Sequence, residues 1–374
     1  MIKVLNIISD TNIGGAGRVL LNYMSSADRT RFDVGVAMPR GSLLKAPLEE
    51  LGTTVYEVEG LADRSYHKDD VRELMALIKR VDPDIVHTHG ALSGRIAGRR
   101  CSKIVIYTRH SAFPVPAKLK YPPGRWVNKW LNEYYSDHII AVSPAAAANL
   151  TDAGISAKYI TTMMNGVTPV ERRPDAECAA LRDRWGIRDG RFVLGILARI
   201  EPYKGHTHIL EAVKMLTDQG RDLQLLIAGT GDYEPELKRQ TQQLGLEDRV
   251  AFLGFQSDVA GFLSVLDLQL NASYGTETSS LSILEGLSMG LPAVVSTYGG
   301  NPWLIDDGED GLLFENRNSG DLARCIARLM DEPETLRSMR KRAVEIFNRR
   351  FTAKIFAQNV EKVYDTVMEG KGHE

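Results

Sequence analysis

Glu277-Thr-Ser-Ser-Leu-Ser-Ile-Leu-Glu285 is a small, hydroxyl-rich segment with a carboxylate at each end, and Gly290-Leu-Pro292 follows it. We expect a turn that opens a helix, because the first N–H groups and the dipole of a helix favour an anionic ligand such as a diphosphate. Glu277 would precede the turn, and Glu285 would lie two turns into the helix on nearly the same face. An isolated pair of this kind is more often two solvated side chains. The rest of the chain therefore decides the interpretation.

Three further segments place candidate anion-binding groups directly after expected strands. Arg199 and Lys204 follow the expected strand 192–198, where Arg can grip a phosphate with two hydrogen bonds and Lys can add a point charge. A surface pair around a proline turn is the structural alternative. Gly229-Thr-Gly231 and Gly14-Gly15 also follow strands, and glycines let the backbone approach a ligand closely. The G-x-G-x-x-G dinucleotide fingerprint is absent, and Gly14-Gly15 fits a plain tight turn equally well.

Histidine and aspartate side chains give candidates for acid–base or metal chemistry. His110 ends an expected strand, where it would be an acid, a base or a hydrogen-bond donor, or simply a residue at the edge of the core. His87 and His89 share a strand face but lack a third ligand at suitable spacing, so we predict no metal site. Asp82-Pro-Asp84 matches a D-x-D pattern that can hold Mn²⁺ or Mg²⁺. It starts a strand, at the edge opposite the expected ligands, and is interpreted as a helix-end turn.

The composition is typical of a globular cytoplasmic protein with more than one domain. The chain has 374 residues, of which 43% are hydrophobic and 25% charged. The N-terminus is too short and too quickly polar for a secretory signal, and no apolar run approaches the ~18 residues of a membrane span. Cys101, Cys178 and Cys325 are odd in number and widely spaced, which favours a reducing compartment. Without a zinc finger, an RNP motif or a basic pI, no nucleic-acid partner is predicted.

Apolar runs alternate with amphipathic stretches through both halves of the chain, which is typical of parallel sheets with crossover helices. The Pro- and Gly-containing segment 165–175 marks the expected domain boundary. We predict two tandem Rossmann-like, doubly wound α/β domains, 1–168 and 172–350, with an interdomain cleft and ligands at the carboxyl ends of the strands. The expected strands are 2–9, 33–37, 54–58, 85–89, 104–108, 138–142, 159–163, 192–198, 223–228, 250–253, 268–270 and 293–296.

Together these segments resemble one family over nearly the whole chain, the retaining nucleotide-sugar glycosyltransferases of family 4, which have the GT-B fold. The glutamate pair at 277 and 285, in register with Arg199 and Lys204, is the most specific part of the match. The other matching segments are Gly14-Gly15, 84–89, 141–144, 165–167, 227–231, 250–254 and Gly290-Leu-Pro292.

The resemblance implies an enzyme, a hexosyl- or N-acetylhexosaminyltransferase with a UDP- or GDP-linked donor. Arg199 and Lys204 would neutralise the donor diphosphate, and we expect both to be exposed. Glu285 would bind the ribose, while Glu277 and His110 would contact the transferred sugar. The catalytic residues would then be His110, Arg199, Lys204 and Glu277. The donor-binding residues would be Gly14, Gly15, Gly231, Gly254, Phe255, Ser279, Ser280, Leu281 and Glu285. A final helix, about 351–374, would cross back to the first domain.

The charges at this site also bear on mechanism. Arg199, Lys204 and the helix start would stabilise the departing diphosphate, so we expect neither a metal nor another cofactor. Thr278-Ser-Ser-Leu281 stands where the family often has Phe-Gly, which leaves the donor base and sugar open. Two alternatives remain: a GT-B epimerase of nucleotide sugars, and a non-catalytic protein that binds nucleotide sugars.

The acceptor implied by the resemblance is a glycan, a lipid-linked glycan or a small molecule, in bacterial-type glycan biosynthesis. Residues 113–135 interleave basic and aromatic side chains, and Trp126 and Trp130 share one helical face. Such a pair is either a core seam, the commoner use, or an anchor at an anionic bilayer. We therefore predict a cytoplasmic protein, with peripheral contact at the inner face of the cell membrane as one of the two interpretations.

Overall fold

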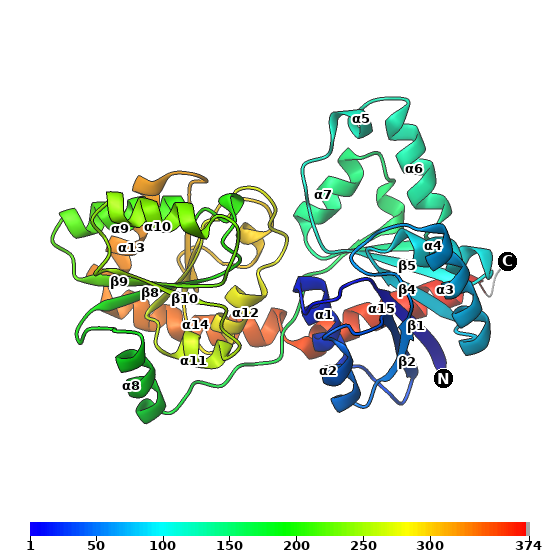
Figure 1. The fold of residues 1–374 in the computed structure, drawn as a ribbon, viewed down its shortest axis with the longest axis horizontal. Helices are drawn as coiled ribbons and strands as arrows, with labels where there is room; N and C mark the ends of the chain where they lie inside the picture. The colour runs from blue at the N-terminus through cyan, green and yellow to red at the C-terminus, as the bar shows by residue number, and fades with distance from the viewer. Residues whose placement is uncertain (372–374) are drawn as a thin grey trace. The chain divides into compact units, whose positions relative to one another are not determined.

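The computed structural model describes residues 1–371, which form two compact units (Figure 1). Unit 1 contains residues 1–168 and the chain from Phe351 onward, and unit 2 contains Pro169–Arg350. Each unit has one parallel sheet flanked by helices, so the predicted class of two Rossmann-like α/β domains is confirmed. The last three residues of the predicted helix 351–374 lie outside the described range.

The sheet of unit 1 has the order β3-β2-β1-β4-β5-β6-β7. Strands inside a parallel sheet are covered on both faces and therefore consist largely of apolar residues. β1 follows this rule, whereas β4 buries five residues of which three are polar, His87, Thr88 and His89. The strands are β1 Ile2–Ile8, β2 Phe32–Pro39, β3 Thr54–Val58, β4 Ile85–His89, β5 Ile104–Arg109, β6 His138–Ala141 and β7 Ile160–Thr162.

Two helices of unit 1, α3 and α7, begin at a side-chain cap, and the last helix of the unit comes from the C-terminal part of the chain. Ser143 accepts a hydrogen bond from the N–H of Ala146 and Pro144 is the first residue of α7, which explains the Ser-Pro sequence structurally. α15 returns to α1 (Figure 1). It buries Tyr364 completely, against the ring of Phe32. The helices are α1 Gly15–Met24, α2 Lys45–Glu50, α3 Lys68–Val81, α4 Leu92–Arg100, α5 Ala117–Lys120, α6 Gly124–Tyr134, α7 Pro144–Asp152 and α15 Ala353–Lys371.

The sheet of unit 2 has the order β10-β9-β8-β11-β12-β13. The short edge strand β13 was not predicted, because its four residues give no extended apolar run. The strands are β8 Phe192–Leu197, β9 Leu223–Ala228, β10 Val250–Gly254, β11 Leu268–Asn271, β12 Ala293–Ser296 and β13 Gly311–Phe314. The helices are α8 Asp175–Arg184, α9 His206–Asp218, α10 Glu234–Gln243, α11 Val259–Ser264, α12 Leu281–Ser288, α13 Ser319–Asp331 and α14 Pro333–Arg350.

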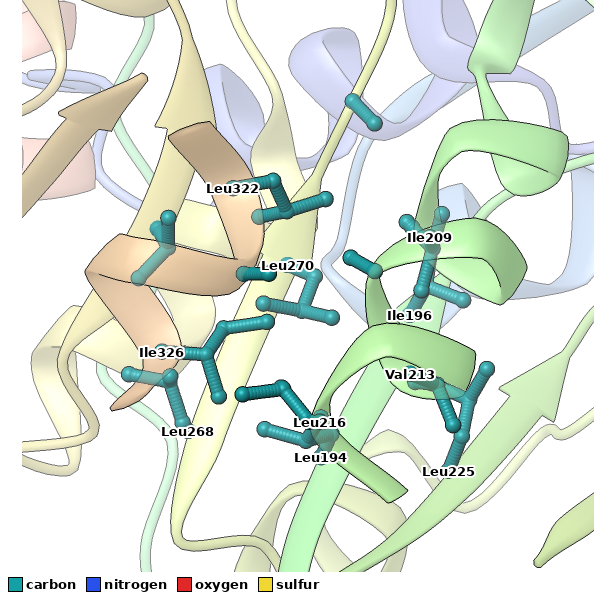
Figure 2. Close-up of a cluster of buried hydrophobic side chains, with 14 of the residues drawn as sticks. Leu194, Ile196, Ile209, Val213, Leu216, Leu225, Leu268, Leu270, Leu322 and Ile326 are labelled. Carbon is teal, nitrogen blue, oxygen red and sulfur yellow. The ribbon is translucent and has the colours of Figure 1, made fainter. Parts of the chain in front are cut away.

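The largest core cluster of unit 2 joins the sheet to α9 and α13. Leu194 of β8 and Leu268 of β11 contribute from the sheet, and Val213 of α9 and Ile326 of α13 cover them (Figure 2). All four side chains are buried, and each fully buried aliphatic side chain contributes about 1.5–3 kcal/mol to folding. This core fixes the strands whose carboxyl ends carry the candidate site.

Candidate active site

The loops after β8 and β11 bring the first candidate residues of unit 2 together. Arg199 follows β8, and Lys204 ends the short 3₁₀ helix η2, Pro202–Lys204. Gly205 then adopts a φ of 76°, and a Cβ atom there would lie 2.0 Å from the carbonyl oxygen of Ala272. Glycine is therefore required for η2 to pack against the end of β11, just before Glu277.

Lys204 and Glu277 form an ion pair in the interior of this site. The Lys204 Nζ lies 2.9 Å from the Glu277 Oε2, and the two side chains are 16% and 8% exposed. The expectation that Lys204 is exposed is therefore wrong, because a buried carboxylate after β11 draws the ammonium inward. The two residues, expected to have separate roles, act as one electrostatic unit in this structure.

Neutral donors complete the surroundings of the Glu277 carboxylate. The Asn271 Nδ2 and the Ser273 Oγ donate to Oε2 over 3.2 and 3.1 Å. Ser296, at the end of β12, donates to the Ser273 carbonyl and accepts from the buried Asn301 side chain. These four polar residues were not predicted, although a polar residue closing an apolar strand, as in Leu-Gln-Leu-Asn271, was a usable signal.

The protonation of Glu277 results from opposing effects. Burial raises the pKa of the Glu277 carboxyl, but the charge of Lys204 and the hydrogen bonds from Lys204, Asn271 and Ser273 together hold the pKa below its usual value of 4.5. Glu277 is therefore ionised at neutral pH, and its negative charge fixes the position of the lysine.

The start of α12 presents backbone donors beside this pair. Ser280 is the N-cap residue, but its side chain makes no capping hydrogen bond and its Oγ lies 3.1 Å from the Ser282 Oγ. Ser279 is buried, and Leu281 is the first helical residue. Because α12 starts this late, Glu285 lies about one turn into the helix, and the expectation of two turns is wrong. The uncapped helix start has N–H groups suited to an anion.

The remaining candidates of unit 2 follow β8, β9 and β10. Arg199 is exposed, and its Nη2 donates to the Tyr203 hydroxyl over 3.0 Å, a partner that was not predicted. A Cβ on Gly231 would lie 2.2 Å from the Ile200 carbonyl oxygen, so packing alone explains this glycine. Gly254 ends β10, and the Phe255 ring next to it is 72% exposed. An exposed aromatic ring at a strand end suits stacking on a planar ligand.

The candidates of unit 1 lie in the segments that follow β1 and β5. Gly14 and Gly15 form the N-terminus of α1, with Gly14 as the N-cap residue. His110 follows β5, and its Nε2 lies 2.9 Å from the Nδ1 of His89. Burial lowers the pKa of His110 to about 4. A neutral ring at pH 7 suits hydrogen bonding better than proton transfer.

The candidate metal ligands are engaged in structural contacts. Asp82 ends α3 in the left-handed conformation and pairs with Lys103, while Asp84 accepts from the N–H of Lys3. His87 bonds to the Tyr364 hydroxyl and to Thr108. Within residues 1–371 no group of three His, Cys, Asp or Glu side chains is arranged to hold a metal ion.

Helix α6 has an unusual orientation, with aromatic side chains on its outer face. Trp126 and Trp130 are 66% and 58% exposed, which contradicts the core-seam interpretation. The inward face is polar instead: Asn132 accepts from the buried Arg95, and Asn128 donates to a carbonyl of the neighbouring segment. Because polar side chains anchor this helix to the rest of unit 1, its aromatic side chains remain exposed.

Comparison with known proteins matches a glycosyltransferase family model in each half of the chain. Residues 13–171 match the model of the family described as Glycosyltransferase Family 4, and residues 179–345 match that of Glycosyl transferases group 1. The chain is similar to the 2-deoxystreptamine glucosyltransferase of Streptomyces kanamyceticus, with 25% identity over 78% of this chain and 79% of the relative.

Two further similarities extend over most of the chain. An Escherichia coli UDP-Gal:alpha-D-GlcNAc-diphosphoundecaprenol alpha-1,3-galactosyltransferase is 25% identical over 88% of each chain. The crystal structure of Anabaena Alr3699/HepE with UDP-glucose superposes with a TM-score of 0.83 and 22% identity, covering 98% of this chain and 100% of that one. At that identity the structural likeness establishes the fold.

Proposed function

Because the two matched families together span most of the chain, the protein belongs to the family 4 glycosyltransferases of GT-B fold, and we propose that it transfers a sugar, with retention of configuration, from a nucleoside diphosphate sugar. It is thus an enzyme of glycan biosynthesis. The arrangement of Lys204, Glu277 and the start of α12 at the carboxyl ends of the unit 2 strands is the observation that carries the proposal.

In the proposed reaction, the bond between the sugar C1 and the diphosphate oxygen breaks and a bond from C1 to the acceptor oxygen forms. Negative charge then develops on the leaving diphosphate. An ammonium has three N–H donors, so Lys204 can keep its bond to Glu277 while donating to a phosphate oxygen. Arg199 and the N–H groups at the start of α12 add further stabilisation. The acceptor proton passes to the departing phosphate, on the face from which the acceptor attacks.

The other residues orient the donor in this proposal. Glu285 accepts from the ribose hydroxyls, Phe255 borders the base, and the neutral ring of His110 hydrogen-bonds the transferred sugar. Gly15 lies against the diphosphate. With Lys204 and Arg199 supplying the positive charge, the reaction needs no metal ion.

The donor is tested by measuring thermal stabilisation with UDP-, GDP- and ADP-sugars, since a bound ligand raises apparent stability by mass action. One similar protein is a UDP-Gal-dependent galactosyltransferase and another was crystallised with UDP-glucose, so UDP donors come first. We expect one donor to stabilise the wild type and Arg199→Ala to weaken this effect. NMR of the product should show the donor's anomeric configuration. A free epimer, or binding without turnover, would favour an alternative activity and overturn the transferase proposal.

We also propose that the acceptor is carried by a lipid and that unit 1 contacts an anionic membrane surface through α5 and α6. The exposed rings of Tyr121, Trp126 and Trp130 suit the interfacial region of a bilayer. The exposed basic residues of the same segment are Lys118, Lys120, Arg125 and Lys129. Each cation near an anionic leaflet contributes up to about 1 kcal/mol. No helix within residues 1–371 is long and apolar enough to span a membrane.

Sedimentation with anionic and with neutral vesicles, across increasing salt, tests this contact. We expect salt-sensitive binding to anionic vesicles that a Trp126→Ser/Trp130→Ser variant loses. Trp303→Ser is the matched control, because this tryptophan of unit 2 is also half exposed. Equal binding of the double variant and the control would leave a water-soluble acceptor as the better assignment.

A further inference from the structure

A line of buried polar side chains lies behind His110 in unit 1. The Asn6 Oδ1 lies 3.0 Å from the His89 Nε2, and the His89 Nδ1 lies 2.9 Å from the His110 Nε2. The three residues come from β1, from β4 and from the end of β5, which are neighbours in the sheet. Asn6 is fully buried and His89 is 7% exposed. In such surroundings each hydrogen bond needs a donor and an acceptor in fixed positions.

The chemistry of the three groups fixes the direction of both hydrogen bonds. An amide oxygen only accepts, and a neutral imidazole has one N–H donor and one acceptor nitrogen. With the Asn6 Oδ1 facing it, the His89 Nε2 must carry the hydrogen, which makes the His89 Nδ1 an acceptor. The hydrogen between the two rings then belongs to the His110 Nε2. Reversing the Asn6 amide would reverse both bonds.

Three imidazoles side by side, of which His87 and His89 are buried, also favour neutral rings. His87 and His89 stack with centroids 4.6 Å apart, and His89 and His110 with centroids 5.1 Å apart. Burial, assisted by the charge of His110, lowers the pKa of His87 to about 3, and burial likewise lowers that of His89, with His87 as a further cause. The tautomer, rather than the charge, is therefore the variable state of these rings at neutral pH.

We propose that Asn6 and His89 are positioning residues that hold His110 as its Nε2–H tautomer, with Nδ1 as the acceptor nitrogen of the ring. This inference rests on the proposed function, in which His110 contacts the transferred sugar. In this tautomer the Nδ1 is an acceptor, whereas in the opposite tautomer the same nitrogen carries the hydrogen and is a donor. Asn6 thereby determines the polarity of a sugar contact although it lies two side chains away.

His87 provides a matched control on the same strand. Its ring stacks on His89, but its nitrogens bond to the Tyr364 hydroxyl over 2.7 Å and to the Thr108 hydroxyl over 2.6 Å. His87 is therefore linked to Asn6 indirectly, through Tyr364, and the Asn6–His89 and His89–His110 bonds do not pass through it. His87→Gln should lower thermal stability without altering the tautomer of His110.

The test is imidazole ¹⁵N NMR of the full chain at pH 8, with the His110 signals identified by their loss in His110→Gln. The wild type should show the Nε2–H tautomer. Asn6→Leu removes the acceptor and should give mixed tautomers, whereas Asn6→Asp keeps an acceptor and should preserve the wild-type spectrum. Once a donor is known, kcat should fall by roughly tenfold in Asn6→Leu, on the scale of one hydrogen bond, and recover in Asn6→Asp.

Two results would overturn the proposal: an Nδ1–H tautomer in the wild type, or an unchanged His110 spectrum in a folded Asn6→Leu protein. Failure of the proposed function looks different. If His110→Gln transfers sugar at the wild-type rate, the sugar contact is wrong, while the tautomer spectra still test the hydrogen-bond chain separately.

Discussion

Removing one member of the Lys204–Glu277 pair should destabilise unit 2. Removing a phosphate-binding lysine that is fully exposed would not lower the stability in this way. Loss of one partner from a buried ion pair costs about 3–5 kcal/mol, because the other charge stays buried. In Lys204→Met the carboxylate keeps its bonds from Asn271 and Ser273, so we expect the lower limit, about 3 kcal/mol. For a unit the size of residues 169–350, that corresponds to a fall in Tm of about 6–12 °C.

A double-mutant cycle measures the pair directly. Glu277→Gln should also destabilise the protein. The Lys204→Met/Glu277→Gln double variant should be less destabilised than the sum of the two single variants. The coupling energy, measured by denaturant unfolding, should be about 2 kcal/mol. Lys214→Met is the control, because Lys214 pairs with Asp218 on the surface and should cost less than about 1 kcal/mol. A coupling energy below about 0.5 kcal/mol would refute the reasoning.

The pH dependence of the same cycle follows from the lowered pKa of Glu277. A carboxyl whose pKa is lower in the folded state stabilises the fold above its unfolded pKa, and this contribution declines as the pH falls through the folded value. The stability difference between wild type and Glu277→Gln should thus be constant at neutral pH and shrink below about pH 4.5.

Three other predictions concern the donor site. Arg199→Ala should lower transfer by roughly 10²-fold or more with an unchanged Tm, because Arg199 is exposed; near-normal turnover would remove it from the diphosphate site. Glu285→Ala should weaken binding of the free nucleoside diphosphate and of the whole donor alike, whereas Glu277→Gln should affect the whole donor more; isothermal titration with both ligands separates the two roles. Transfer should survive excess EDTA, and a loss that Mn²⁺ restores would contradict a metal-free mechanism.

Local patterns predicted the strands well because parallel strands buried on both faces must be apolar. The bounds of β3, β4, β9 and β12 agree with the predicted ranges. The start of α12 was misplaced because three consecutive hydroxyl-bearing residues, 278–280, fit a turn and a first helical turn equally well. The late start moved Glu285 by a turn relative to the expectation.

Contacts between distant residues could not be predicted. Lys204 meets Glu277 only because β8 and β11 are neighbours in the sheet, an order that no local spacing specifies. For the same reason the line from Asn6 to His110 was not foreseen, although His89 and His110 were both singled out. The outward direction of Trp126 depends on the buried Arg95, which holds α6 by its polar side.

The discontinuous make-up of unit 1 has a consequence for the order in which a nascent chain folds. Residues 1–168 leave the ribosome long before α15 is made, and until then Phe32 and His87 lack the Tyr364 side chain that covers and hydrogen-bonds them. Unit 2 is continuous and can finish folding first, because domains generally fold as units during synthesis. The N-terminal half of this chain is thus synthesised first but completed last.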